Sequence, residues 1–182
     1  TCGVCPDGNS DCAAKDEVTR LSLSYNGLGG DFSKFQLDAF SNTLVELTLA
    51  GNALSGSFPP SLWSLTELTS LSLFYNSVSG DLPDNLGDLT NLVELDLDQN
   101  DLTGPIPDVL SKLTKLTKLD LGNNELSGEI PKSLAALTNL NKLDLGNNQL
   151  EGSIPSELDQ LTNLKTLNVA GNPNLDTTLS DV

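Results

Sequence analysis

Residues 116–139 read LTKLDLGNNELSGEIPKSLAALTN, and this 24-residue stretch is the unit from which most of the chain is built. Its recurring features are two leucines two positions apart, an asparagine, a glycine, a proline and two leucines three positions apart: Leu119, Leu121, Asn124, Gly128, Pro131, Leu134 and Leu137. The same features recur in both directions at intervals of 24 residues. Such strict repetition predicts a solenoid, because each unit can bury its apolar side only against its neighbours.

The asparagine marks the repeat most clearly, at Asn52, Asn76, Asn100, Asn124, Asn148 and Asn172. Counting outward from this ladder predicts seven repeats over residues 18–172, with starts at 18, 44, 68, 92, 116, 140 and 164. We expect residues 1–17 to form a separate, cysteine-containing N-terminal cap. A carboxamide both donates and accepts hydrogen bonds, so a buried ladder of asparagines can satisfy the backbone groups where the chain leaves each strand.

Two spacings within each unit predict its secondary structure. The alternation around Leu119 and Leu121 has a period of two, which indicates a short strand, and equivalent strands of successive units must pair in parallel about 4.8 Å apart. After the proline, leucines spaced by three suit a 3₁₀ turn better than an α-helix, which needs mixed spacings of three and four. We therefore expect an α/β repeat with a parallel sheet on one side and short 3₁₀ turns on the other.

The composition excludes several classes of function. The 182 residues include 9 Lys+Arg, 25 Asp+Glu and no His, giving a net charge of −16. Nucleic acids and anionic membranes would be repelled, and catalytic or metal sites that need histidine are excluded. No apolar run approaches the roughly 20 residues of a membrane helix. Because the chain begins at Thr1 and lacks Met, we expect a processed or trimmed product from which any targeting signal has been removed.

The unit LxxLxLxxNxLxGxIPxxLxxLxx resembles the plant-type, 24-residue class of leucine-rich repeats, found in receptor-kinase ectodomains and polygalacturonase-inhibiting proteins. The resemblance covers roughly residues 18–172. It implies a right-handed curved solenoid whose parallel sheet forms the concave face, with 3₁₀ turns on the outer face. It also implies that a ligand binds on the concave face.

Cys2, Cys5 and Cys12 precede the repeats. Zinc usually requires four nitrogen or sulfur ligands, so a disulfide-stapled cap over the first repeat is the better interpretation. Three pairings are possible and one cysteine is left over. The spacing of Cys5 and Cys12 is similar to that in the family's N-terminal cap, so the resemblance favours a Cys5–Cys12 disulfide, with the partner of Cys2 removed or absent.

Residues 173–182 lack a cysteine cap and depart from the repeat register, which predicts an irregular C-terminal end. Either Leu175 and Leu179 fold over the last repeat as a lid, or the native protein continues.

Aromatic residues stand out among the outward positions of the predicted strands and the turns beyond them. Phe74 is a large ring in a column that is otherwise small or polar, with Tyr75 beside it, and Tyr25 lies on an equivalent turn. Exposed aromatics of this kind are typical of binding hot spots. The alternative is that Phe74 simply folds onto its neighbours, as single surface apolar residues often do.

Acidic residues form the second candidate surface: Glu94, Asp96, Asp98, Asp120 and Asp144. Nothing basic occurs between Lys34 and Lys112, whereas 11 acids fall within residues 35–111. Such carboxylates could hold Ca²⁺ or steer a basic partner. A solvated acidic face, with lysines diagonally close, is the favoured interpretation, and we expect no metal and no cofactor. An open concave face has no water-excluding pocket to raise one carboxyl pKa, so we expect no enzyme activity.

The outer side carries a third regular column, formed by Thr66, Thr90, Thr114, Thr138 and Thr162. A hydroxyl lattice could order water, and a plant antifreeze protein belongs to the family that this chain resembles. Glu67 and Lys115 interrupt the neighbouring column, which weakens this interpretation.

These patterns together predict a non-catalytic recognition module that binds a protein or peptide ligand, with basic ligands favoured by the acidic columns. We expect it to be part of a secreted or cell-surface protein, although the chain has no N-glycosylation sequon, unlike most plant ectodomains of this class. The alternatives are an inhibitor of a wall-degrading enzyme and an ice- or polysaccharide-binding structural protein that uses the outer threonines.

Overall fold

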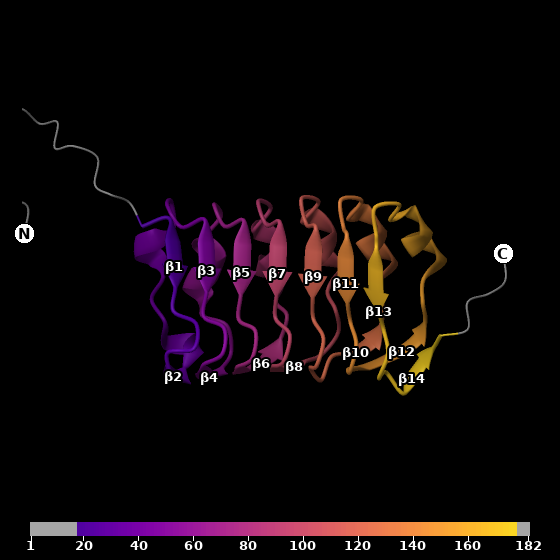
Figure 1. Ribbon diagram of the computed structural model, residues 1–182, viewed down its shortest axis with the longest axis horizontal. Coiled ribbons are helices and arrows are strands. Elements are labelled where there is room, and N and C mark those ends of the chain that lie inside the picture. Colours follow the sequence, from indigo (N-terminus) through magenta and orange to yellow (C-terminus); the bar gives the residue numbers. More distant parts are fainter. Residues whose placement is uncertain (1–17, 178–182) are drawn as a thin grey trace, which may run out of the picture.

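The computed structural model describes residues 18–177, in which short parallel strands lie side by side in the order of the sequence (Figure 1). One sheet contains seven of them: β1 (Arg20–Ser22), β3 (Glu46–Thr48), β5 (Ser70–Ser72), β7 (Glu94–Asp96), β9 (Lys118–Asp120), β11 (Lys142–Asp144) and β13 (Thr166–Asn168). The register pairs equivalent positions of successive units, as in Leu95 with Leu119. The predicted leucine-rich-repeat solenoid with a parallel sheet is therefore confirmed, and this sheet forms its concave face.

A second row of strands, which the sequence analysis did not predict, follows the ladder asparagines (Figure 1). It consists of a four-stranded sheet, β2 (Gly29–Asp31), β4 (Ala53–Gly56), β6 (Ser77–Asp81) and β8 (Asp101–Thr103), and a three-stranded sheet, β10 (Ser127–Glu129), β12 (Gln149–Ser153) and β14 (Asn174–Asp176). Between the two sheets, a bridge pairs Pro105 with Ser127, and the N–H groups of Glu125 and Ser127 donate to the carbonyls of Leu102 (2.8 Å) and Gly104 (2.9 Å).

The first six units return through short 3₁₀ helices, as the leucine spacing predicts. The helices are η1 (Phe32–Lys34), η2 (Asp38–Phe40), η3 (Pro60–Ser64), η4 (Asp84–Asp88), η5 (Asp108–Lys112), η6 (Lys132–Ala136) and η7 (Ser156–Gln160). From η3 onward a proline occupies the N-cap, as Pro107 does with φ −79°. The proline ring restricts φ and cannot donate a hydrogen bond, so it sets where the extended segment ends.

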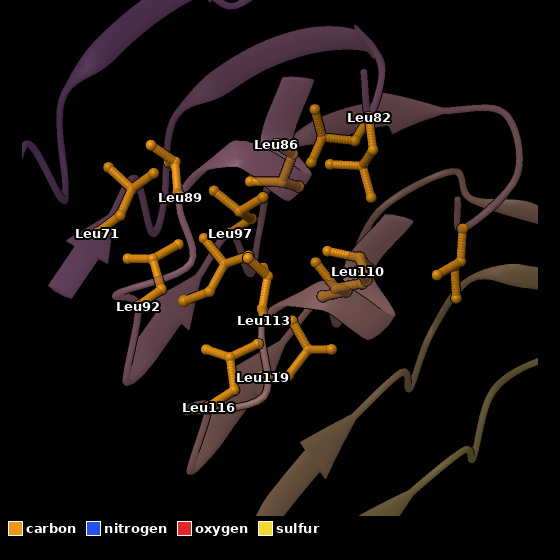
Figure 2. Close-up of a cluster of buried hydrophobic side chains, with 14 of the residues drawn as sticks. Leu71, Leu82, Leu86, Leu89, Leu92, Leu97, Leu110, Leu113, Leu116 and Leu119 are labelled. Carbon is orange, nitrogen blue, oxygen red and sulfur yellow. The ribbon is translucent and has the colours of Figure 1, made fainter. Parts of the chain in front are cut away.

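Leucines from the strands and the 3₁₀ helices meet in one continuous interior (Figure 2). Leu71, Leu95 and Leu119 reach it from the concave sheet, and Leu86 and Leu110 reach it from the helices; each is at most 1 % exposed. Because every unit contributes the same residue type at the same place, each layer packs against an equivalent layer on either side.

The asparagine ladder connects successive units through side-chain to backbone hydrogen bonds. Asn100 Nδ2 donates to the carbonyl of Leu97 in its own unit (3.1 Å) and to that of Leu73 in the preceding unit (3.0 Å). Its Oδ1 accepts from the Val78 backbone N–H (3.0 Å) of the preceding unit. Asn124 and Asn148 repeat this arrangement.

The C-terminal end differs in part from the prediction of an irregular segment. Residues Asn174–Asp176 form strand β14, which pairs with β12 and leaves Leu175 only 8 % exposed. The parallel pairing extends past the point at which the repeat register slips, because backbone ladders need no particular side chain. Leu179, the other residue of the expected lid, lies outside the described residues, as do Cys2, Cys5 and Cys12.

No helix within residues 18–177 is both long enough and apolar enough to cross a membrane.

Replacing Asn100 with Ala should lower the free energy of unfolding by about 1–3 kcal/mol, because buried carbonyl and N–H groups of two units lose their partner. Urea unfolding followed by circular dichroism would measure the loss. Asn85→Ala is the control, because exposed Asn85 makes only a 3.5 Å contact with Asp88 and should change little. Equal stability of the two variants would contradict a structural role for the ladder.

Candidate ligand-binding surface

The outward positions of the concave sheet form two regular columns, because the register pairs the same position of every unit. The first contains Arg20, Glu46, Ser70, Glu94, Lys118, Lys142 and Thr166, and the second contains Ser22, Thr48, Ser72, Asp96, Asp120, Asp144 and Asn168. The leucines between the two columns point inward, and those from β3 to β11 are buried. These columns can therefore vary between units without disturbing the core.

The C-terminal half of the concave face carries an ion-pair ladder rather than bare carboxylates. Lys118 Nζ lies 2.5 Å from Asp96 Oδ2, and Lys142 Nζ lies 2.6 Å from Asp120 Oδ2. Each lysine also approaches the aspartate of its own unit, Asp120 at 3.9 Å and Asp144 at 3.5 Å. Three of the acidic residues predicted from the sequence are thus ion-paired, and Asp120 is shared by both lysines. Among the residues that the structure describes, no cluster of acidic or thiol side chains is placed to hold a metal ion.

Asp120 is the buried member of this ladder. Burial disfavours its charged form and raises the pKa of its carboxyl above the ordinary value of 3.8, even though Lys142 acts in the opposite direction. Lys142 is more exposed, and its hydrogen bond to Asp120 stabilises its charged form and raises the pKa of its ammonium group. Desolvation therefore outweighs attraction at the carboxylate but not at the lysine.

The negative charge that is not neutralised lies further toward the N-terminus, in the unit of β7. Glu94 is exposed and forms no ion pair with any residue in the described range. Asp98 Oδ1 accepts a hydrogen bond from the neutral side chain of Asn123 (2.7 Å), which leaves its charge in place. Asp98 lies next to Tyr75 in the adjacent unit, because its backbone carbonyl accepts from the N–H of Tyr75 (3.0 Å).

Three aromatic residues lie near the N-terminal half of the concave face. Tyr25 and Tyr75 are 69 % and 57 % exposed, respectively, whereas Phe74 is half-buried. The rings of Phe74 and Tyr75 are 6.0 Å apart between centroids, with 37° between their planes. The structure thus brings Phe74 and Tyr75 together and places Tyr25 two units away, at the equivalent turn.

Both tyrosines have a left-handed backbone, which the sequence analysis did not foresee. Their φ angles are +57° for Tyr25 and +56° for Tyr75. The residue before each ladder asparagine shares this conformation, and the other occupants are Gly51, Gln99, Asn123, Asn147 and Gly171. Glycine and asparagine adopt it readily, but a bulky aromatic residue does not. The position before each ladder asparagine is occupied by two glycines and two asparagines among its seven residues. This preference was the signal in the sequence that could have revealed the left-handed backbone.

The outer face differs from the regular lattice that ice binding would need. Its five threonines are exposed, but neighbouring asparagine side chains hydrogen-bond to the protein's own backbone. Asn91, Asn139 and Asn163 each donate to the carbonyl of the threonine one unit earlier, at 3.0, 2.8 and 2.8 Å. Lys115 Nζ in turn donates to Asn91 (2.7 Å). The column of residues that follow the threonines therefore links the outer turns of successive units by hydrogen bonds.

The comparisons with known proteins agree with this architecture. A family model described as a leucine-rich repeat region matches residues 33–181. No curated protein sequence matches the chain at a significant level.

Solved structures that resemble the chain include ectodomains of plant receptor kinases. One is the ectodomain of GASSHO1/SCHENGEN3 from Arabidopsis thaliana, solved in complex with CASPARIAN STRIP INTEGRITY FACTOR 2. It is 36 % identical in sequence, with a TM-score of 0.78, and the match covers 86 % of this chain and 18 % of the receptor chain. A Pollen Receptor Kinase 3 is 31 % identical with a TM-score of 0.81, covering 98 % and 82 %. HAESA from Arabidopsis thaliana, in complex with the peptide hormone IDA and the co-receptor SERK1, is 31 % identical with a TM-score of 0.70, covering 90 % and 35 %. The chain thus spans less than two thirds of two of these proteins.

Stability should depend on pH through Asp120. Because its native pKa is raised, the protein holds this proton more tightly when folded, and this group's contribution to stability is lost as pH rises through its native pKa. As pH rises above the ordinary value of 3.8 and through the raised native pKa, wild type should therefore lose stability relative to Asp120→Asn. Thermal melts of both proteins across this range would measure it, and a relative gain by wild type would mean that the lysines outweigh burial.

Exchanging Tyr75 for Asn should leave the free energy of unfolding unchanged or raise it by up to about 1 kcal/mol, because Asn relieves the left-handed strain and little ring packing is lost. Leu73→Ala, two residues away and fully buried, is the destabilising control and should lose about 2–5 kcal/mol. Chemical denaturation would compare them. A loss above about 1 kcal/mol in Tyr75→Asn would show that the ring holds the turn together.

Proposed function

The chain belongs to the plant-type leucine-rich repeat family, and we propose that it is a non-catalytic recognition module that binds a protein or peptide ligand on its concave face. The observation that carries the proposal is the contrast between neighbouring columns. Leucines at inward positions such as Leu71 and Leu95 are the same in every unit, whereas the outward columns change from Ser72 to Asp96 in adjacent strands. A face that is free to vary over an invariant core suits recognition.

The similar structures support a peptide or protein as the ligand. HAESA is bound to a peptide hormone and a co-receptor, and the GASSHO1/SCHENGEN3 ectodomain is bound to CASPARIAN STRIP INTEGRITY FACTOR 2. Both are ectodomains or receptors of much greater length, so this chain corresponds to one segment of such a surface. Their setting also supports an extracellular or cell-surface location, for which a Cys5–Cys12 disulfide in the N-terminal cap is the matching proposal.

The electrostatics of the face favour a ligand with some positive charge. Glu94 and Asp98 carry charge that no lysine within residues 18–177 neutralises, whereas Lys118 and Lys142 neutralise the carboxylates further along. A basic group on the ligand would therefore be attracted to the centre of the stack, next to Phe74 and Tyr75, and less to its C-terminal half.

Selection of binding peptides from a random display library would test the proposal, followed by variants on the two faces. Phe74→Ala should raise the dissociation rate and weaken binding by about 1–2 kcal/mol, because an aromatic contact is lost. Asp98→Asn should slow association at low salt and have little effect at 1 M salt, where the Debye length is about 3 Å.

Thr90→Ala and Thr114→Ala are the matched controls, because both threonines are exposed on the outer face. They should leave the kinetics unchanged. Binding that survives the concave substitutions and is lost with the outer ones would assign recognition to the other side of the solenoid.

A further inference from the structure

Tyr25 and Tyr75 occupy the same register position two units apart, and we propose that they form a docking ridge for a proline-rich peptide segment in the polyproline II conformation. The segment would run along the stack and place a basic residue beside Asp98 and Glu94. This inference rests on the recognition function proposed above and names the chemistry of its ligand.

The two tyrosines are an unfavourable choice for stability at their positions. The ladder register imposes a left-handed backbone on the whole column, and in four of its seven units Gly or Asn meets this demand. A large aromatic residue in this conformation is strained, and the exposed fractions of 69 % and 57 % show that burial does not offset the strain. Strained residues that packing does not explain concentrate where a protein binds something.

The residue between the two tyrosines is a glycine, which leaves room for the Tyr25 ring. Gly51 holds the same register position in the intervening unit, and the Tyr25 ring lies against it. A Cβ added to Gly51 would come 2.2 Å from Tyr25 Cε1, so any side chain there would displace the ring. Tyr25 and Tyr75 share the left-handed backbone, with φ angles of +57° and +56°, and so leave equivalent turns of the stack.

The spacing of the ridge matches one turn of polyproline II. Adjacent units are separated by about 4.8 Å in a parallel sheet, so equivalent atoms two units apart are about 9.6 Å apart. A polyproline II helix rises about 3.1 Å per residue with three residues per turn, or about 9.3 Å per turn. Residues i and i+3 of such a segment would therefore be spaced to contact Tyr25 and Tyr75 in turn.

Exposed tyrosines suit this ligand chemically. Prolines at i and i+3 present apolar rings that pack on aromatic faces, and the preformed helix loses little entropy on binding. A polyproline II backbone has unpaired carbonyls, which the two phenolic hydroxyls can satisfy as donors.

Charge complementarity selects a basic residue at the end of the segment nearer β7. Glu94 is exposed and without an ion pair among the described residues, and Asp98 lies in the unit directly after Tyr75. No Lys or Arg occurs between Lys34 and Lys112. The ridge therefore lies beside uncompensated negative charge, which a neutral polysaccharide would not use but a lysine or arginine would.

Calorimetric titration with three synthetic ligands would test the inference. The first is a peptide with Pro-x-x-Pro followed by Lys, the second has the same composition with the prolines two positions apart, and the third is a glucose oligosaccharide. The first peptide should bind at least about tenfold more tightly than the second, since only i, i+3 spacing reaches both rings.

Tyr25→Asn and Tyr75→Asn should each weaken binding of the first peptide by at least about fivefold, and the double variant should abolish it. Gln99→Asn is the matched control, because it changes the same column without removing an aromatic ring and should bind as wild type does. Asn suits the left-handed backbone, so these variants keep the fold, which a thermal melt verifies. Asp98→Asn should weaken the Lys-containing peptide and not its Gln analogue.

Equal affinity for the two proline spacings, or binding that survives the double variant, would overturn the inference. Tyrosine-dependent binding of the oligosaccharide without the peptide would also overturn it and make the ridge a sugar platform. If peptides selected by display bind the concave face but proline-rich ones do not, the inference fails while the proposed function stands. If no peptide depends on the concave face, the proposed function fails as well.

Discussion

Each unit of this protein must satisfy the backbone groups that are exposed where its strand ends, and one asparagine side chain does this for two units at once. Asn100 binds the carbonyls of Leu73 and Leu97 and the N–H of Val78, so it joins a turn to the turn before it. An unpaired buried carbonyl or N–H would be costly. Because every unit meets the same requirement, the asparagine recurs in each, at 24-residue intervals from Asn52 to Asn172.

This requirement has a second consequence one residue earlier in the chain. To aim the asparagine inward, the preceding residue adopts a left-handed conformation in unit after unit. Most units meet this with Gly or Asn, but two place a tyrosine there and accept the strain. The buried ladder asparagine and the variable surface residue are therefore neighbours in the sequence. Where this surface residue is neither Gly nor Asn, stability alone does not explain the choice.

The concave face is divided by how its charges are compensated. In the C-terminal half, Lys118 and Lys142 each contact the aspartates of their own and the preceding unit, so charge is balanced locally and Asp120 can be buried. Toward the N-terminus, Glu94 and Asp98 lack such lysines and lie beside aromatic rings. A charged or apolar ligand would distinguish the two halves, although both are built on the same sheet.

The sequence by itself determined the solenoid, its concave strands, its 3₁₀ turns and the inward direction of the asparagines, because these follow from spacing and from residue type. It also showed which acids and aromatics point outward. The tertiary structure alone decided which carboxylates are neutralised, since Lys118 and Asp96 are 22 positions apart and meet only through the strand register. It also revealed the second row of strands and the left-handed backbone of the two tyrosines, at which the sequence hinted only through the Gly and Asn residues in the same column. Backbone pairing and φ depend on how one unit stacks on the next, which no single unit encodes.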